Sequence, residues 1–141
     1  MKNEIYVDYA LRGKVGIYSD SPFLRVSFIP TEKIDWQIEG EALAILSGVK
    51  YFLKEKKEEN KKLVIYTDSR TLLRPFRSKT QAGKWWFGAK SLAQKSNCEL
   101  EIKFVSGKKN PADCLTRSRE CIQKTREKKT YFYQQWLSKV E

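Results

Sequence analysis

The 141-residue chain contains no histidine and only three cysteines, and these shortages exclude several kinds of chemistry. Without histidine, neither a zinc site built from His and Cys nor a serine–histidine or cysteine–histidine nucleophile system can form. Cys98, Cys114 and Cys121 are odd in number and lack CxxC spacing. This predicts no metal site at the cysteines and no structural disulfide in a reducing compartment. Carboxylates are left as the leading catalytic groups of any enzyme made from this chain.

Long apolar runs are also missing. Hydrophobic residues make up 40% of the chain, which is enough to bury one core. They are too interrupted to form a membrane span. The first residues, Met1 to Glu4, lead straight into a predicted strand without the apolar core of a signal peptide. We therefore expect an intracellular, cytoplasmic protein with no membrane partner.

Positive charge is in excess. The chain has 28 basic and 17 acidic residues, for a formal net charge of +11. Such a charge favours a polyanionic partner, most often nucleic acid. The alternative is a lysine-rich solvated surface.

The first third of the chain is patterned as strands. We predict strands at Glu4–Tyr9, Val15–Tyr18 and Leu24–Ile29, joined by short turns. The third alternates apolar residues with polar or charged ones, as a half-buried strand does. Three strands with short connections indicate an antiparallel meander.

Helical spacing replaces this pattern after Pro30, where Leu43, Leu46, Val49 and Leu53 recur on one face. The continuous apolar run that follows predicts a strand paired in parallel with an earlier one. The fold class is therefore α/β, with a five-stranded mixed sheet, three antiparallel strands then two parallel, flanked by helices. The later elements are predicted at Leu63–Thr67 (strand), 69–96 (helical, broken near Pro75 and Gly83), Leu100–Val105 (strand) and from Asp113 onward (helix).

Four acidic residues lie at the ends of predicted strands or at the start of predicted helices. Asp8 and Asp68 each end an apolar run, Glu41 opens a helix-patterned stretch, and Asp113 lies in a helix-starting phrase. If the fold brings these carboxylates together, their mutual repulsion requires a cation. Mg²⁺ prefers such oxygen ligands, and pairs of these ions serve phosphodiester hydrolysis.

The phrases around these acids resemble those of ribonuclease H of type 1 and of the ribonuclease H domains of reverse transcriptases. That family has an aspartate closing the first strand, which Asp8 matches. Glu41–Ile45 matches its helical glutamate followed by small and apolar residues, and Thr67–Ser69 matches its Thr-Asp-Ser phrase. Asn110–Arg117 matches its Asn-x-Ala-Asp-x-Leu-x-Arg phrase. The resemblance covers roughly Glu4 to Ser118.

The order of the acids separates this family from others of the same fold. Proofreading-type exonucleases carry an Asp-x-Glu pair on the first strand, where this chain has Asp8-Tyr9-Ala10. Transposases and integrases take their glutamate from a helix after the second aspartate. Here Glu41 precedes Asp68, which favours ribonuclease H.

The resemblance implies an endonuclease that cuts the RNA strand of an RNA/DNA hybrid, leaving 5′-phosphate and 3′-hydroxyl ends. It implies two Mg²⁺ ions, with Mn²⁺ as a substitute. We expect residues 1–118 to form the catalytic domain and 119–141 a basic and aromatic helical extension of it. The implied catalytic residues and metal ligands are Asp8, Glu41, Asp68 and Asp113.

A second set of residues is predicted to contact the nucleic acid. Gln37 stands where the family usually has an asparagine, and Arg70 where glutamine is common. The lysines near the aromatic run Trp85–Phe87 are candidates for phosphate contacts or are plain surface charge. The full set comprises Gln37, Gly40, Ser69, Arg70, Lys79, Lys84 and Lys90.

Several alternatives stay open. The chain is either a non-catalytic nucleic-acid-binding module of the same fold or a DNA-directed nuclease such as a junction resolvase, if it is not a ribonuclease H. It is either free-standing or part of a larger reverse transcriptase. The tail either packs back on the domain or mediates self-association.

Overall fold

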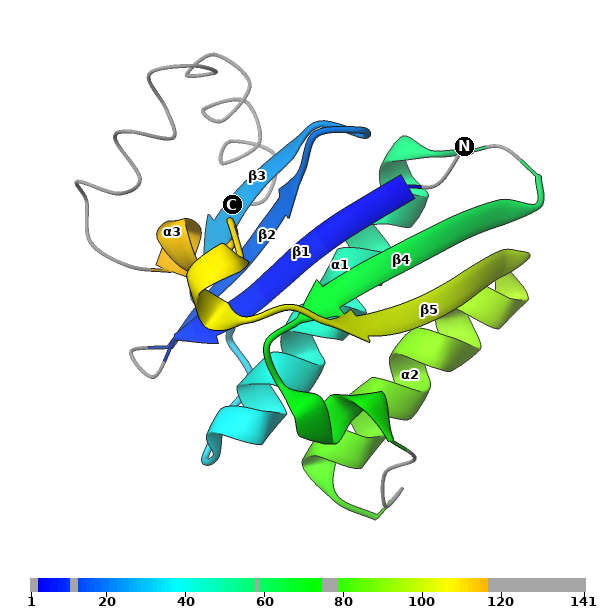
Figure 1. Ribbon diagram of the computed structural model, residues 1–141. Helices are drawn as coiled ribbons and strands as arrows, with labels where there is room; N and C mark the ends of the chain where they lie inside the picture. Colours follow the sequence, from blue (N-terminus) through cyan, green and yellow to red (C-terminus); the bar gives the residue numbers. More distant parts are fainter. Residues whose placement is uncertain (1–2, 11–12, 58, 75–78, 117–141) are drawn as a thin grey trace.

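A computed structural model describes residues 3–10, 13–57, 59–74 and 79–116 of the chain (Figure 1). The strands and helices follow one another along the chain in the predicted order. The elements are β1 (Asn3–Ala10), β2 (Lys14–Ser19), β3 (Leu24–Phe28), α1 (Gln37–Glu55), β4 (Lys61–Thr67), the short 3₁₀ turn η1 (Arg70–Leu73), α2 (Gln81–Lys95), β5 (Cys98–Phe104), η2 (Gly107–Lys109) and α3 (Asp113–Thr116).

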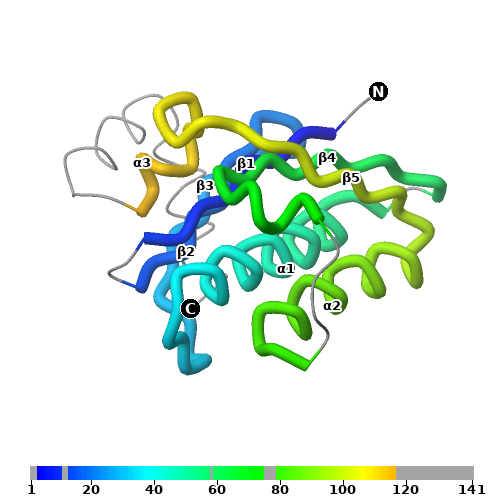
Figure 2. The backbone as a smooth tube through the Cα atoms, turned by 60° about the horizontal axis from the view of Figure 1, so that its bottom comes forward, coloured from blue at the N-terminus to red at the C-terminus, as the bar shows by residue number. Residues whose placement is uncertain are grey.

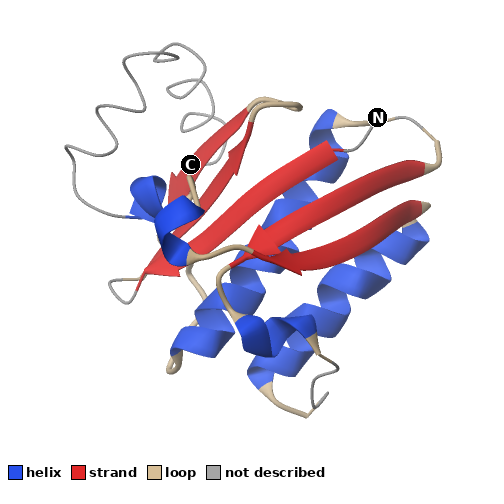
Figure 3. Cartoon of the chain, in the orientation of Figure 1, coloured by secondary structure: helices blue, strands red, loops and turns tan. Residues whose placement is uncertain are grey.

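The five strands form one mixed sheet in the order β3-β2-β1-β4-β5 (Figure 3). β1 pairs antiparallel with β2 and parallel with β4, while β5 runs parallel to β4. The predicted fold class is thereby confirmed. The pairing of β1 with β4 ends at Tyr6, opposite Tyr66, although β1 itself continues to Ala10. Among the described residues, no strand therefore lies beside the last part of β1 on the β4 side.

The two long helices cover one face of the sheet, and α3 lies on the other (Figure 2). The core between the sheet and α1 is built from fully buried apolar side chains such as Ile5, Ile65, Ile45 and Phe52. α3 is fastened to the opposite face because the Ser27 hydroxyl donates a 2.7 Å hydrogen bond to the Leu115 carbonyl. The end of β1 therefore lies between α1 and α3.

α1 begins at Gln37, earlier than the Glu41 that its apolar pattern indicates. Hydrogen bonds from a side chain explain this earlier start. The Glu39 carboxylate accepts hydrogen bonds from the backbone N–H groups of Asp35 (2.8 Å) and Trp36 (3.1 Å), which closes the start of the helix. Glu39 thus has a structural partner, and Glu41 is left to face the site.

α2 is continuous through Gly83, so the predicted break at this residue is wrong. Gly83 lies in the first turn, where its backbone N–H donates to the Thr80 hydroxyl at 3.0 Å. A glycine there costs less than one in the middle of a helix, and the cap offsets the cost. Further along, Trp86 is buried and donates from Nε1 to the Leu72 carbonyl at 2.8 Å. The Trp85–Phe87 run thus places a tryptophan in the core.

Two further predictions concern the cysteines and the tail. Cys98 is free and buried, but Cys114 is disulfide-bonded, so the prediction of no disulfide is wrong. That prediction rested on the expected compartment, whereas proximity in the fold decides whether a bond can form. The predicted extension 119–141, as well as Arg117 and Pro75, lies outside the described residues. Within the described ranges no helix is long and apolar enough to cross a membrane.

Gly16 on β2 allows α3 to lie close to the sheet. A Cβ at this position would stand 2.8 Å from the Ala112 carbonyl oxygen and 2.9 Å from the Thr116 methyl group. Backbone cannot yield as a flexible side chain can, so we expect Gly16→Ala to destabilise the fold by about 1–3 kcal/mol in urea unfolding. Gly88→Ala is the control, since its Cβ would meet only Leu46 methyls at 3.9 Å or beyond.

Gly88 lies inside α2, where alanine is the better helix former. The control should therefore gain about 0.5–1 kcal/mol. Equal stability of the two variants would show that α3 does not press on the sheet at Gly16.

Candidate active site

Asp8 and Asp68 come from the adjacent parallel strands β1 and β4. Asp8 lies beyond the last residue pair of these strands, and Asp68 directly follows β4. The carboxyl ends of neighbouring parallel strands meet at one edge, which is where open α/β sheets bind ligands. Asp8 is only 6% exposed, and its Oδ2 accepts a 2.9 Å hydrogen bond from the Thr116 hydroxyl. Asp68 is half-buried.

Glu41 reaches the same edge from the start of α1. Its Oε1 accepts a hydrogen bond of 3.2 Å from the Gln37 side-chain amide, one helical turn earlier. The same amide nitrogen donates to the Tyr9 carbonyl at 2.6 Å. Ser69, next to Asp68, also hydrogen-bonds to Glu41. Glu41 is therefore linked to both strands that carry the aspartates.

Asp113 begins α3 and is positioned by Asn110. The Asn110 side chain is buried, donates to the Val7 carbonyl at 2.9 Å and accepts from the Ala112 N–H at 3.0 Å. It thus caps the turn, as expected for its phrase, and also fastens that turn to β1.

The side-chain amides of Asn110 and Gln37 therefore supply hydrogen bonds to β1 that β4 does not provide there. The carbonyls of Val7 and Tyr9 flank Asp8 at the part of β1 where β4 no longer pairs with it. Asn110 donates to the first carbonyl and Gln37 to the second. Buried carbonyls need such partners. The segments that carry Asp113 and Glu41 are consequently tied to β1 on either side of Asp8.

The carboxylates are close enough to change one another's protonation. Burial, followed by the negative charge of Asp68, raises the pKa of Asp8 to about 7, and Asp113 adds to this while the Thr116 hydrogen bond opposes it. Burial raises the pKa of Asp68 above its usual value, and the charge of Asp113 adds to the increase. Burial also raises the pKa of Glu41, with hydrogen bonds from Gln37 and Ser69 opposing and Asp68 adding to the rise.

The four predicted acids thus meet at one place, and their environment suits a cation. Their donors are oxygen atoms, and the charges acting on Asp8, Glu41 and Asp68 are those of neighbouring carboxylates. Asp68 Oδ1 is buried without a hydrogen-bond partner among the described residues. A hard divalent ion would supply what that oxygen lacks. In the described ranges, however, no three Asp, Glu, Cys or His side chains stand close enough together to hold an ion as they are. The donors fit Mg²⁺ in type, but the described side chains do not form a ready metal site.

The residues predicted to contact nucleic acid fall into two groups, one within or beside the carboxylate cluster and one of exposed basic side chains. Ser69 and Gln37 lie within the carboxylate cluster, where the Gln37 amide nitrogen already donates to two acceptors. Gly40 is buried, and the Tyr9 ring lies so close to it that no Cβ would fit. The remaining four residues are exposed and basic, namely Arg70, Lys79, Lys84 and Lys90.

Two of these cations rest on aromatic rings. The Arg70 guanidinium lies 4.2 Å from the centre of the Phe104 ring, and Lys90 Nζ lies 4.6 Å from a Trp86 ring centre. Such contacts hold the charge at a fixed place on the surface. Arg70 follows Ser69 directly and is therefore the exposed cation nearest in sequence to the cluster.

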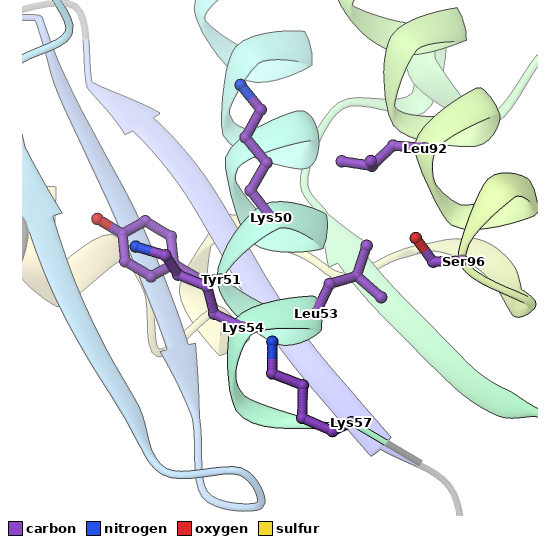
Figure 4. Close-up of a pocket in the computed structure, with 7 residues that line it drawn as sticks. All are labelled: Lys50, Tyr51, Leu53, Lys54, Lys57, Leu92 and Ser96. Carbon is purple, nitrogen blue, oxygen red and sulfur yellow. The ribbon is translucent and has the colours of Figure 1, made fainter. Parts of the chain in front are cut away.

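A cavity of about 620 Å³ between α1 and α2 is a different feature (Figure 4). It lies along the second half of α1, at least nine residues after Glu41, which is about 13 Å along the helix axis. None of its described lining residues carries a carboxylate, so it is separate from the cluster. Its lining residues are Lys50, Tyr51, Leu53, Lys54, Lys57, Leu92 and Ser96.

Three contributors to the site were not found from the sequence. Thr116 contacts Asp8, Asn110 contacts β1 in addition to capping a turn, and Tyr9 covers Gly40. Thr116 had a detectable signal, because it follows Asp113 by three residues and so lies on the same helix face. The Asn110 and Tyr9 contacts had none, since each depends on where β1 runs relative to distant segments.

No family model and no curated protein matches this chain. Solved structures do match its fold. One is RNase H1 from the halophilic archaeon Halobacterium salinarum, with a TM-score of 0.61 and 15% identity over 88% of this chain and 99% of that one. Another is the N-terminal RNase H domain of a Mycobacterium tuberculosis protein, with a TM-score of 0.60 and 14% identity over 82% and 95%. The chain has the ribonuclease H fold.

Proposed function

We propose that this protein is a divalent-metal-dependent endonuclease that cuts the RNA strand of RNA/DNA hybrids. The observation that carries the proposal is the meeting of Asp8, Glu41, Asp68 and Asp113 at one edge of a ribonuclease H fold. A module that only binds nucleic acid gains nothing from buried carboxylates, because they repel phosphates. The order of the acids along the chain supports the same conclusion.

The four carboxylates would hold the metal, and the other residues of the cluster prepare them. Two bound Mg²⁺ ions would supply a hydroxide near neutral pH and stabilise the leaving 3′ oxygen, so that products carry 5′-phosphate and 3′-hydroxyl ends. Asp8 is held by Thr116, and Glu41 by Gln37 and Ser69. These hydrogen bonds favour the ionised carboxylates that a metal needs.

The exposed cations beside the cluster suit the sugar–phosphate backbones of the substrate. Arg70, Lys79, Lys84 and Lys90 are exposed, and the chain carries a net charge of +11. Contacts to phosphates release counterions, so the affinity for a hybrid should fall steeply with salt. Distinguishing RNA from DNA needs contact with the 2′-hydroxyl. The polar groups beside Glu41 that we propose for this contact are Ser69 and the Gln37 side-chain oxygen, which is buried and has no hydrogen-bond partner among the described residues.

One assay tests the proposal against its alternatives. Labelled RNA/DNA hybrid, double-stranded RNA, double-stranded DNA and a four-way junction are each incubated with the protein, with Mg²⁺ and with excess EDTA. We expect cleavage of the RNA strand of the hybrid alone, its loss with EDTA and its return with Mn²⁺. Cleavage of the junction would instead identify a resolvase, and hybrid binding without any cleavage would identify a binding module.

A further inference from the structure

Thr116 stands where three parts of the site meet. Its side chain is buried, at 4% exposure, on the last residue of α3. The hydroxyl oxygen lies 2.9 Å from Asp8 Oδ2 and 3.0 Å from the Asp113 carbonyl. The methyl group lies against Gly16, where a Cβ would be only 2.9 Å away. One side chain therefore touches β1, β2 and the start of its own helix.

The usual hydrogen bond of a helical threonine to its own backbone accounts for only one of these contacts. Threonine in a helix commonly donates to the carbonyl three or four residues earlier, which here is that of Asp113. The contact with Asp8 is additional, and a hydroxyl has one hydrogen to give. An ionised carboxylate is a stronger acceptor than a carbonyl, so the hydrogen belongs to Asp8 when Asp8 is charged.

The methyl group fixes the direction in which the hydroxyl points. A β-branched side chain has few rotamers, and the space above Gly16 holds the methyl group of Thr116. The hydroxyl is then aimed at Asp8 before any ligand arrives. Holding Oδ2 restrains the Asp8 carboxylate, which also hydrogen-bonds to Asp113.

We propose that Thr116 is a positioning residue that orients the Asp8 carboxylate for the metal and ties it to the helix that carries Asp113. This inference rests on the proposed function, since it concerns the same carboxylates. Partners that orient metal-binding side chains typically affect metal affinity or activity by about 10–100-fold. Thr116 would act in this way although it touches no reacting atom.

Three variants separate this role from simple packing. Thr116→Val keeps the shape and removes the hydroxyl, whereas Thr116→Ser keeps the hydroxyl and removes the methyl group. Ser27→Ala is the structural control, because Ser27 also fastens α3 to the sheet by a hydroxyl, at 2.7 Å from the Leu115 carbonyl, and touches no carboxylate. All three are measured for thermal unfolding, for Mn²⁺ binding by calorimetry without nucleic acid, and for kcat and KM on an RNA/DNA hybrid.

We expect Thr116→Val to weaken Mn²⁺ binding and to lower kcat by about tenfold each, with KM for the hybrid unchanged. Thr116→Ser should stay within about threefold of the wild type, and Ser27→Ala should lose stability only. Wild-type metal affinity and kcat in Thr116→Val would overturn the proposal, as would equal losses in Ser27→Ala. If the wild type binds Mn²⁺ but cuts no hybrid, the proposed function fails, and the metal titrations still decide the role of Thr116.

Discussion

Asp68→Asn should lower the rate of hybrid cleavage by about 10³-fold or more while leaving the fold and hybrid binding intact. Asp68 Oδ1 is a buried oxygen without a hydrogen-bond partner among the described residues, so the amide breaks no hydrogen bond at this oxygen. The amide has nearly the same shape but lacks the negative charge that attracts a divalent ion. Losing about 4 kcal/mol of transition-state stabilisation corresponds to such a factor. The measurement is the single-turnover cleavage rate at saturating hybrid and Mg²⁺.

Asp35→Asn is the matched control for this change. Asp35 is exposed and lies 4.0 Å from Lys33 in a weak surface ion pair. It loses the same charge at an exposed side chain outside the cluster, so its rate should stay within about twofold of the wild type. Undiminished cleavage by Asp68→Asn would remove Asp68 from the mechanism.

Without a metal, the protein should become less stable as the pH rises from about 4 to about 7. Burial and the charge of Asp68 raise the pKa of Asp8 from 3.8 to about 7 in the folded state. Across this window the unfolded chain has lost the proton of Asp8 while the folded protein keeps it, so deprotonation favours unfolding. The loss is at most about 4 kcal/mol, since one pKa unit is worth about 1.4 kcal/mol.

Asp8→Asn isolates this contribution, because the amide cannot ionise. In EDTA at pH 8, we expect this variant to unfold at a higher temperature than the wild type, and its stability should depend less on pH between 4 and 7. Adding Mg²⁺ should stabilise the wild type and not the variant. Identical pH profiles of the two proteins in EDTA would show that the ionisation of Asp8 does not lower the stability of the folded protein.

The fold and the four acids were accessible from the sequence because each depends on local pattern. Apolar runs end at Asp8 and Asp68, and parallel strands bring such ends to one edge whatever the details of packing. The phrase from Asn110 to Asp113 combines a cap with a first-turn acid, which is a local signal. The fold itself is shared with solved structures at only 14–15% identity, where no family model matches.

The contacts that hold the acids in place were not accessible in the same way. That Gln37 and Asn110 donate to β1 follows from β1 running past its pairing with β4, which is a matter of strand lengths. The packing of Tyr9 on Gly40 depends on the distance between α1 and the sheet. In each case two distant segments decide the outcome together.

The central claim is that four carboxylates from separate elements bind divalent ions at one edge of the sheet. The most direct measurement is the anomalous X-ray scattering of Mn²⁺ in crystals of the protein bound to an RNA/DNA hybrid. The account predicts Mn²⁺ among Asp8, Glu41, Asp68 and Asp113, within about 2.0–2.4 Å of their oxygen atoms. Crystals in which Mn²⁺ binds elsewhere, or in which these carboxylates stay free of metal beside the hybrid, would contradict it.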